Sequence, residues 1–123
     1  MTPTLSMVLI YARDMQKTAE FYCRFFGFQQ ISDPDDGLIE LRPPEDSGGA
    51  TLYIHRAAKS VKLGQVGVKL VFAVPDVEAF KARSAKLGLV FGSTHQGDGY
   101  TFANAKDPDK NNVAISSRPF RQR

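Results

Sequence analysis

The chain has 123 residues, of which 42% are hydrophobic and 24% are charged, and its formal net charge is +3. This length predicts one domain, or two small halves that share a core. The single cysteine, Cys23, excludes an intrachain disulfide and a cysteine-rich zinc site. No apolar run reaches the roughly 20 residues of a membrane helix. No basic residue precedes the first apolar segment either, so we expect a cytoplasmic protein with no signal peptide and no membrane partner.

The positive charge is concentrated at the C-terminus. Arg118, Arg121 and Arg123 lie in a segment that contains no acidic residue, and removing these three charges from +3 leaves residues 1–117 neutral. A nucleic-acid-binding protein more often has its positive charge as a patch on the folded body. We therefore expect no nucleic-acid partner and interpret residues 118–123 as a frayed, solvated basic tail.

The first half of the chain predicts a strand, a helix and three further strands. Apolar and β-branched residues over 5–12 predict the first strand. Asp14 then has the position of a helix N-cap, and Gly27 has the position that ends the helix over 15–26. The later strands are predicted over 28–32, 38–42 and 50–56, with a turn over 33–37.

The same pattern restarts after a linker over 57–65. A strand over 68–74 leads to Asp76, which is predicted to cap a helix that ends at Gly88. Three more strands are predicted over 89–93, 99–105 and 112–117, with His95 in an exposed loop over 93–99. Asp76 follows Asp14 by 62 residues, and Gly88 follows Gly27 by 61. The repeat predicts an α+β fold of two βαβββ modules, over about 5–56 and 66–117.

Two segments of the repeat resemble a known superfamily. The helix segment RDMQKTAEFYCRFFGF and the turn DPDKNN before the last strand are similar to the vicinal oxygen chelate proteins, namely the glyoxalase, bleomycin resistance protein and dioxygenase relatives. The turn departs from the usual D-P-D-G-N at Lys110. The resemblance covers residues 5–117 and implies that each module curls into a half-barrel around a cleft. It also implies a homodimer, and a divalent metal held by the first and last strands.

The ligand positions that this resemblance implies fall on Met7, Thr51, Lys69 and Ala114. Methionine is a soft ligand, alanine has no donor atom, and a lysine ammonium repels a cation. We therefore predict no metal and no other cofactor. A divalent metal bound by His55, Glu40 or His95 is the alternative.

Lys69 is the candidate of greatest interest, because a charged residue begins an otherwise apolar strand. It would bind a carboxylate, phosphate or enolate as a point charge, or act as a base or nucleophile. The structural alternative is a lysine that extends to solvent. His55 is predicted to share a strand face with Thr51 and Tyr53, either as a general base or as a hydrogen-bonded residue at the strand end.

Tyr100 is interpreted as a ligand contact, and Phe102, two residues later, as a core residue. The predicted function is the binding of a small organic, anionic molecule, in the manner of metal-free bleomycin resistance proteins. The alternatives are a metal-dependent lyase, isomerase or dioxygenase, a metal-free enzyme using Lys69, His55 or Tyr100, and a regulatory module with a filled cleft. The residues predicted to line the ligand site are Met7, Thr51, Tyr53, His55, Lys69, Tyr100 and Ala114.

Overall fold

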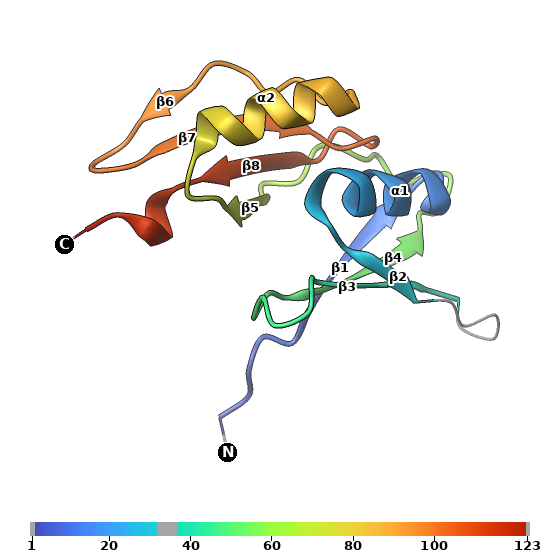
Figure 1. Cartoon of the computed structure of the whole chain (residues 1–123). Helices are drawn as coiled ribbons and strands as arrows, with labels where there is room; N and C mark the ends of the chain where they lie inside the picture. Colours follow the sequence, from blue (N-terminus) through green and yellow to red (C-terminus); the bar gives the residue numbers. More distant parts are fainter. Residues whose placement is uncertain (1, 32–36, 123) are drawn as a thin grey trace. The chain divides into compact units, whose positions relative to one another are not determined.

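A computed structural model describes residues 2–31 and 37–122 of the chain. The chain divides into two compact units, Met1–Leu63 and Gly64–Arg123. Each unit has the element order βαβββ, which confirms the predicted α+β repeat (Figure 1). The predicted turn over 33–37, apart from Gly37, and Arg123 lie outside the described residues.

The first unit is a four-stranded mixed sheet with the strand order β1-β4-β3-β2. Strand β1 is parallel to β4, whereas β3 is antiparallel to both β4 and β2. The parallel pair places Met7 opposite Thr51. The strands are β1 (Met7–Ala12), β2 (Gln29–Ile31), β3 (Ile39–Arg42) and β4 (Thr51–Arg56).

Helix α1 (Met15–Phe26) contacts all four strands of this sheet. The Asp14 side chain accepts a hydrogen bond from the Lys17 N–H at 3.1 Å, and Gly27 ends the helix in the left-handed conformation with φ 76°. Both caps were predicted from the sequence and are confirmed. The core beneath the helix includes Ala19, Tyr22, Leu41 and Ile54, which are fully buried.

The second unit repeats this topology with the strand order β5-β8-β7-β6. Helix α2 (Val77–Leu87) begins after Asp76, whose side chain accepts from the Ala79 N–H at 3.0 Å, and ends at Gly88. These caps are also confirmed. The strands are β5 (Lys69–Ala73), β6 (His95–Gln96), β7 (Thr101–Lys106) and β8 (Asn112–Ser116).

The strand predicted over 89–93 is wrong. Within this described stretch, the Gly92 N–H donates to the Asn104 carbonyl at 2.8 Å, but no strand forms. Gly92 has no side chain to pack against a neighbouring strand, which weakens regular pairing. Strand β6 forms instead in the predicted loop over 93–99, with His95 opposite Phe102. His95 is exposed, as predicted.

The C-terminal segment contacts Tyr100 and Thr101 at the start of strand β7, so the prediction of a frayed tail is wrong for residues 118–121, whereas residues 118–120 are exposed, as predicted. A short 3-10 helix, η1 (Arg118–Phe120), follows Ser117, whose N–H donates to the Thr101 carbonyl at 3.0 Å. The guanidinium carbons of Arg118 and Arg121 lie 5.2 Å and 5.6 Å from the centre of the Tyr100 ring. A guanidinium is attracted to the face of an aromatic ring, which holds the segment in place.

The turn before β8 is organised by a buried carboxylate. The Asp107 side chain accepts from the N–H groups of Asp109 and Asn111, each at 2.9 Å, and from Asn111 Nδ2 at 3.0 Å. Lys110 has a φ of 69°, a left-handed conformation that favours glycine. The motif DPDKNN therefore builds the turn, and its departure from the usual glycine places Lys110 in a conformation that side chains rarely adopt.

Candidate functional site

Each sheet has one face covered by its helix and one face without a helix (Figure 1). In β1 the exposed and half-buried residues alternate, and Met7, Leu9 and Tyr11 are 49%, 40% and 51% exposed. Side chains that are opposite each other across paired strands lie on the same face. We call the helix-free side of the first sheet face 1. It carries Met7, Leu9, Tyr11, Glu40, Arg42, Thr51, Tyr53 and His55.

Four of the predicted site residues lie together on face 1. Met7 is opposite Thr51, and Tyr53 and His55 follow on the same strand. The His55 ring makes an edge contact with the Tyr11 ring, with the centroids 5.6 Å apart. Its Nδ1 lies 2.8 Å from the Arg56 carbonyl oxygen. Because a carbonyl oxygen can only accept, Nδ1 is the donor in this contact.

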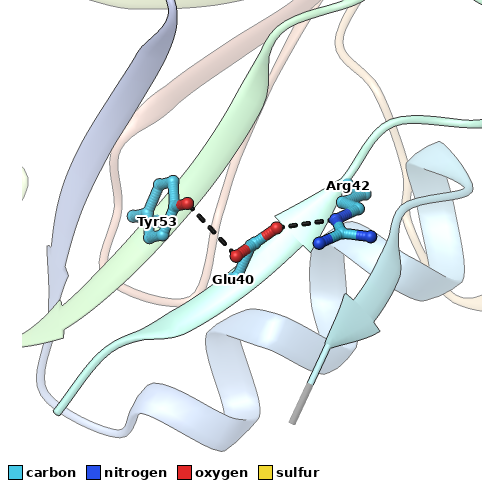
Figure 2. A network of polar contacts seen from close by, with 3 residues as sticks. All are labelled: Glu40, Arg42 and Tyr53. Carbon is cyan, nitrogen blue, oxygen red and sulfur yellow. Dashed lines mark hydrogen bonds and ion pairs between the residues drawn. The ribbon is translucent and has the colours of Figure 1, made fainter. Parts of the chain in front are cut away.

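Glu40 joins face 1 through a network that the sequence did not reveal (Figure 2). Tyr53 Oη donates to Glu40 Oε1 at 3.1 Å, and Arg42 Nε donates to Glu40 Oε2 at 2.7 Å. The hydrogen bond from Arg42, supported by the one from Tyr53, lowers the pKa of the Glu40 carboxyl. Glu40 is therefore an ionised carboxylate whose charge Arg42 balances and whose direction Tyr53 fixes.

Replacing Glu40 by Gln is expected to reduce stability at neutral pH but not in acid. The folded-state pKa of Glu40 lies below its usual value of 4.5, so its stabilising contribution is present above that value. The contribution is lost as the pH falls through the lowered folded-state pKa. Thermal unfolding of the wild type and Glu40→Gln between pH 7 and pH 3 would check this. Tyr53→Phe, which keeps the ion pair of Glu40 with Arg42, should differ less from the wild type in thermal stability. A stability difference between Glu40→Gln and the wild type that does not change with pH would contradict the prediction.

The helix-free side of the second sheet is called face 2. In β5 the exposed positions are Lys69, Val71 and Ala73, and Val71 is 57% exposed. Face 2 extends across the sheet, because β5 pairs with β8 in parallel and β8 pairs with β7 in antiparallel orientation. Face 2 contains Lys69, Val71, Ala73, His95, Phe102, Asn104, Lys106, Asn112, Ala114 and Ser116.

Lys69 extends over the middle of face 2. Its Nζ donates to Asn104 Oδ1 at 2.9 Å, although β8 lies between the two strands. The residue of β8 opposite Asn104 is Ala114, which is 1% exposed. Its methyl group is small enough to lie beneath the lysine side chain. The Lys69 ammonium also lies 5.8 Å from the centre of the Phe102 ring. Phe102 is half-buried on this face, so its prediction as a core residue is wrong.

The residues at the implied ligand positions do not fit a divalent metal. Lys69 uses its ammonium as a hydrogen-bond donor, Met7 and Thr51 offer a thioether and a hydroxyl, and Ala114 offers no donor atom. The described part of the chain has no group of three or more His, Cys, Asp or Glu residues that could hold a metal ion. Glu40, an alternative ligand, is already bonded to Tyr53 and Arg42.

Tyr100 is an anchor for the C-terminal segment. Its ring lies so close to Gly97 that a β-carbon there would be 2.4 Å from Cζ. Its hydroxyl accepts from Arg118 Nη1 at 3.2 Å. The ring centroid is 6.2 Å from that of Phe102, so Tyr100 borders face 2.

Three residues were not among the predicted site candidates, namely Asn104 on face 2, and Arg118 and Arg121 on the Tyr100 ring at its border. Asn104 could have been found, because it alternates with Phe102 along the same strand. The two arginines were assigned to a solvated tail, and nothing in their local sequence indicated Tyr100 as the partner.

Comparison with known proteins adds to this description. The family model Glyoxalase/Bleomycin resistance protein/Dioxygenase superfamily matches residues 4–115. A search of curated proteins finds no match. Among solved structures, UcmS2 has a TM-score of 0.79 at 20% identity, covering 95% of this chain and 99% of its own.

Two further structures share the fold. TnmS3, described as an antibiotic binding protein from Streptomyces sp. CB03234, has a TM-score of 0.75 at 19% identity, with 93% of this chain and 94% of that chain covered. A lactoylglutathione lyase from Agrobacterium tumefaciens has a TM-score of 0.70 at 20% identity, with 94% and 93% covered. The repeat of two βαβββ units and the family match over residues 4–115 lead to one conclusion: the chain belongs to the Glyoxalase/Bleomycin resistance protein/Dioxygenase superfamily.

Proposed function

We propose that the protein binds a small organic anion on face 2 and that Lys69, in place of a metal ion, supplies the positive charge. The hydrogen bond from Lys69 Nζ to Asn104 Oδ1 carries this proposal. A neutral amide positions the ammonium without cancelling its charge, whereas a carboxylate would neutralise it. An ammonium has three donors, and Asn104 takes one of them. Two donors and a full charge therefore remain for a ligand.

The relatives support binding of a small molecule in general terms. TnmS3 is described as an antibiotic binding protein, and it shares the fold of this chain. The lactoylglutathione lyase shares the fold too, so the fold alone does not choose between binding and catalysis. The residues support binding over metal-dependent catalysis, because a metal-dependent lyase, isomerase or dioxygenase would need donor atoms that Met7, Lys69 and Ala114 do not supply.

We further propose that the protein acts in the cytoplasm as a homodimer. The single cysteine suits a reducing compartment, and the dimer is what the superfamily resemblance implies. Among the described residues, neither helix is long and apolar enough to cross a membrane. The neutral charge of residues 1–117 supports a small-molecule ligand over nucleic acid.

Metal analysis is the first test of the proposed function. Protein grown with Zn, Ni, Mn and Fe, and purified without chelators or a tag, is expected to contain less than about a tenth of an equivalent of any of them, since weak surface binding rarely survives purification. Plasma mass spectrometry measures this directly. A near-stoichiometric metal content would overturn the proposal and direct attention to lyase and dioxygenase assays.

The second test measures anion binding by calorimetry at low ionic strength. A charged hydrogen bond contributes about 1.5–3 kcal/mol, so Lys69→Gln should weaken binding of 2-naphthoate about tenfold or more. Lys69→Arg, which keeps the charge, should retain part of the affinity. Lys81→Gln is the matched control, because Lys81 Nζ also bonds to a neutral acceptor, Thr94 Oγ1 at 2.9 Å, and comes from helix α2. Equal affinity in the wild type and Lys69→Gln would reject Lys69 as the binding group.

A further inference from the structure

Face 2 has an aromatic centre with positive charge at two places. The Phe102 ring is stacked with the His95 ring, with centroids 5.1 Å apart and an interplanar angle of 30°. The Lys69 ammonium lies 5.8 Å from the Phe102 centroid, and the Tyr100 centroid lies 6.2 Å from it. The Phe102 ring is therefore close to both the Lys69 ammonium and the ring of Tyr100, which anchors the C-terminal segment.

The second positive place is the pair of arginines on Tyr100. Arg118 Nη1 donates to Tyr100 Oη at 3.2 Å, and Arg121 Nη1 donates to the Asp98 carbonyl at 3.3 Å. Both partners of these bonds are neutral groups, and neither arginine takes part in an ion pair with another described residue. A guanidinium has five N–H donors. Each arginine therefore has most of its donors and its full charge left.

We propose that Arg118 and Arg121 form a second anion-binding point, so that face 2 takes a flat, conjugated ligand with two acidic groups. One acidic group would bind Lys69 and the other the two guanidiniums, with the conjugated ring against the rings between them. This inference rests on the proposed function, because it needs Lys69 as the first anion-binding group.

The chemistry of the two anion-binding points and of the rings between them supports this ligand class. Guanidinium groups bind carboxylates with two parallel hydrogen bonds, which fixes the direction of a planar acid. The His95 ring is exposed on the edge strand β6, so a flat ring can continue the stack that Phe102 and His95 begin. A saturated chain with the same charges would gain the electrostatic attraction but not the stacking.

The test compares three probes by calorimetry at low ionic strength. They are naphthalene-2,6-dicarboxylate, which is flat with two charges, 2-naphthoate, which is flat with one charge, and octanedioate, which is flexible with two charges. We expect the flat dianion to bind the wild type about tenfold more tightly than either other probe, since one further charged hydrogen bond contributes roughly that factor. Equal affinities for the two naphthalene probes would overturn the second anion-binding point.

Variants assign the effect to the two arginines. Arg118→Gln combined with Arg121→Gln should remove the advantage of the dianion over 2-naphthoate, whereas the two Arg→Lys changes, which keep the charge but not the paired donors, should keep part of it. Arg83→Gln is the matched control, because Arg83 lies over an aromatic ring of the same unit, 4.8 Å from the Phe80 centroid, but on helix α2. A dianion advantage that survives in the double Gln variant would overturn the inference.

The two proposals fail in different ways. If 2-naphthoate binding depends on Lys69 but the dianion has no advantage, this inference is overturned and the proposed function stands. If 2-naphthoate binding is the same in Lys69→Gln as in the wild type, the proposed function is overturned, and this inference with it.

Discussion

Replacing Asp107 by Ala should lower the free energy of unfolding of the protein by about 3 kcal/mol, because hydrogen bonds to a charged group contribute roughly 1.5–3 kcal/mol each and are not additive. The Asp107 side chain is 4% exposed and accepts three hydrogen bonds within the turn that leads into β8. Its loss leaves the N–H groups of Asp109 and Asn111 without this acceptor in a partly buried turn. Urea unfolding followed by circular dichroism would measure the change.

The controls for this prediction change fewer hydrogen bonds. Asp107→Asn keeps one oxygen acceptor and should cost less than Asp107→Ala. Asn111→Ala removes one of the three bonds, that from Nδ2 to Asp107 Oδ2, and should also cost less. A loss below about 0.5 kcal/mol in Asp107→Ala, the range of ordinary surface substitutions, would show that the carboxylate does not organise the turn.

Ala114→Glu should weaken the binding of small anions to face 2 by about tenfold or more, the factor that a difference of about 1.4 kcal/mol in binding free energy produces. Ala114 is opposite both Val71 and Asn104, under the path that the Lys69 side chain takes across β8. A carboxylate at this position would be within reach of the Lys69 ammonium and would compete with the ligand for it. Calorimetry with 2-naphthoate would measure the loss.

Ala114→Gln separates the effect of charge from that of size. Both replacements are larger than the alanine, which is 1% exposed, so both should reduce stability to a similar degree through overpacking. Only Glu can neutralise Lys69. If the Glu and Gln variants lose affinity equally, the loss comes from size, and the role assigned to the Lys69 charge is wrong.

Local patterns predicted the architecture well. Each helix start needs an acceptor for its first N–H groups and each helix end a left-handed residue, and Asp14, Gly27, Asp76 and Gly88 supply these. The repeat of these four residues at nearly constant spacing, together with the strand patterns around them, predicted the two βαβββ modules. Alternation along the strands then predicted correctly that Thr51, Tyr53 and His55 share a face.

Contacts between distant residues could not be predicted in the same way. The hydrogen bond between Tyr53 and Glu40 depends on the register of β3 against β4. The hydrogen bond between Lys69 and Asn104 depends on the strand order, which places β7 two strands away from β5. Neither register nor strand order is encoded by local periodicity. The cation–π contacts of Arg118 and Arg121 with Tyr100 likewise join segments that no sequence pattern relates.

The strand order of the second unit has a consequence for the way this sheet assembles. Strands β7 and β8 are joined by a short turn, whereas β5 pairs with β8 across a much longer stretch, with Lys69 opposite Asn112. Contacts between residues that are far apart in sequence form late, because the long loop must close first. We expect β5 to join a hairpin that already exists. A ligand that binds Lys69 together with residues of β7 would then bind the completed sheet and not the hairpin that precedes it. Binding of this ligand would stabilise the pairing of β5 by mass action.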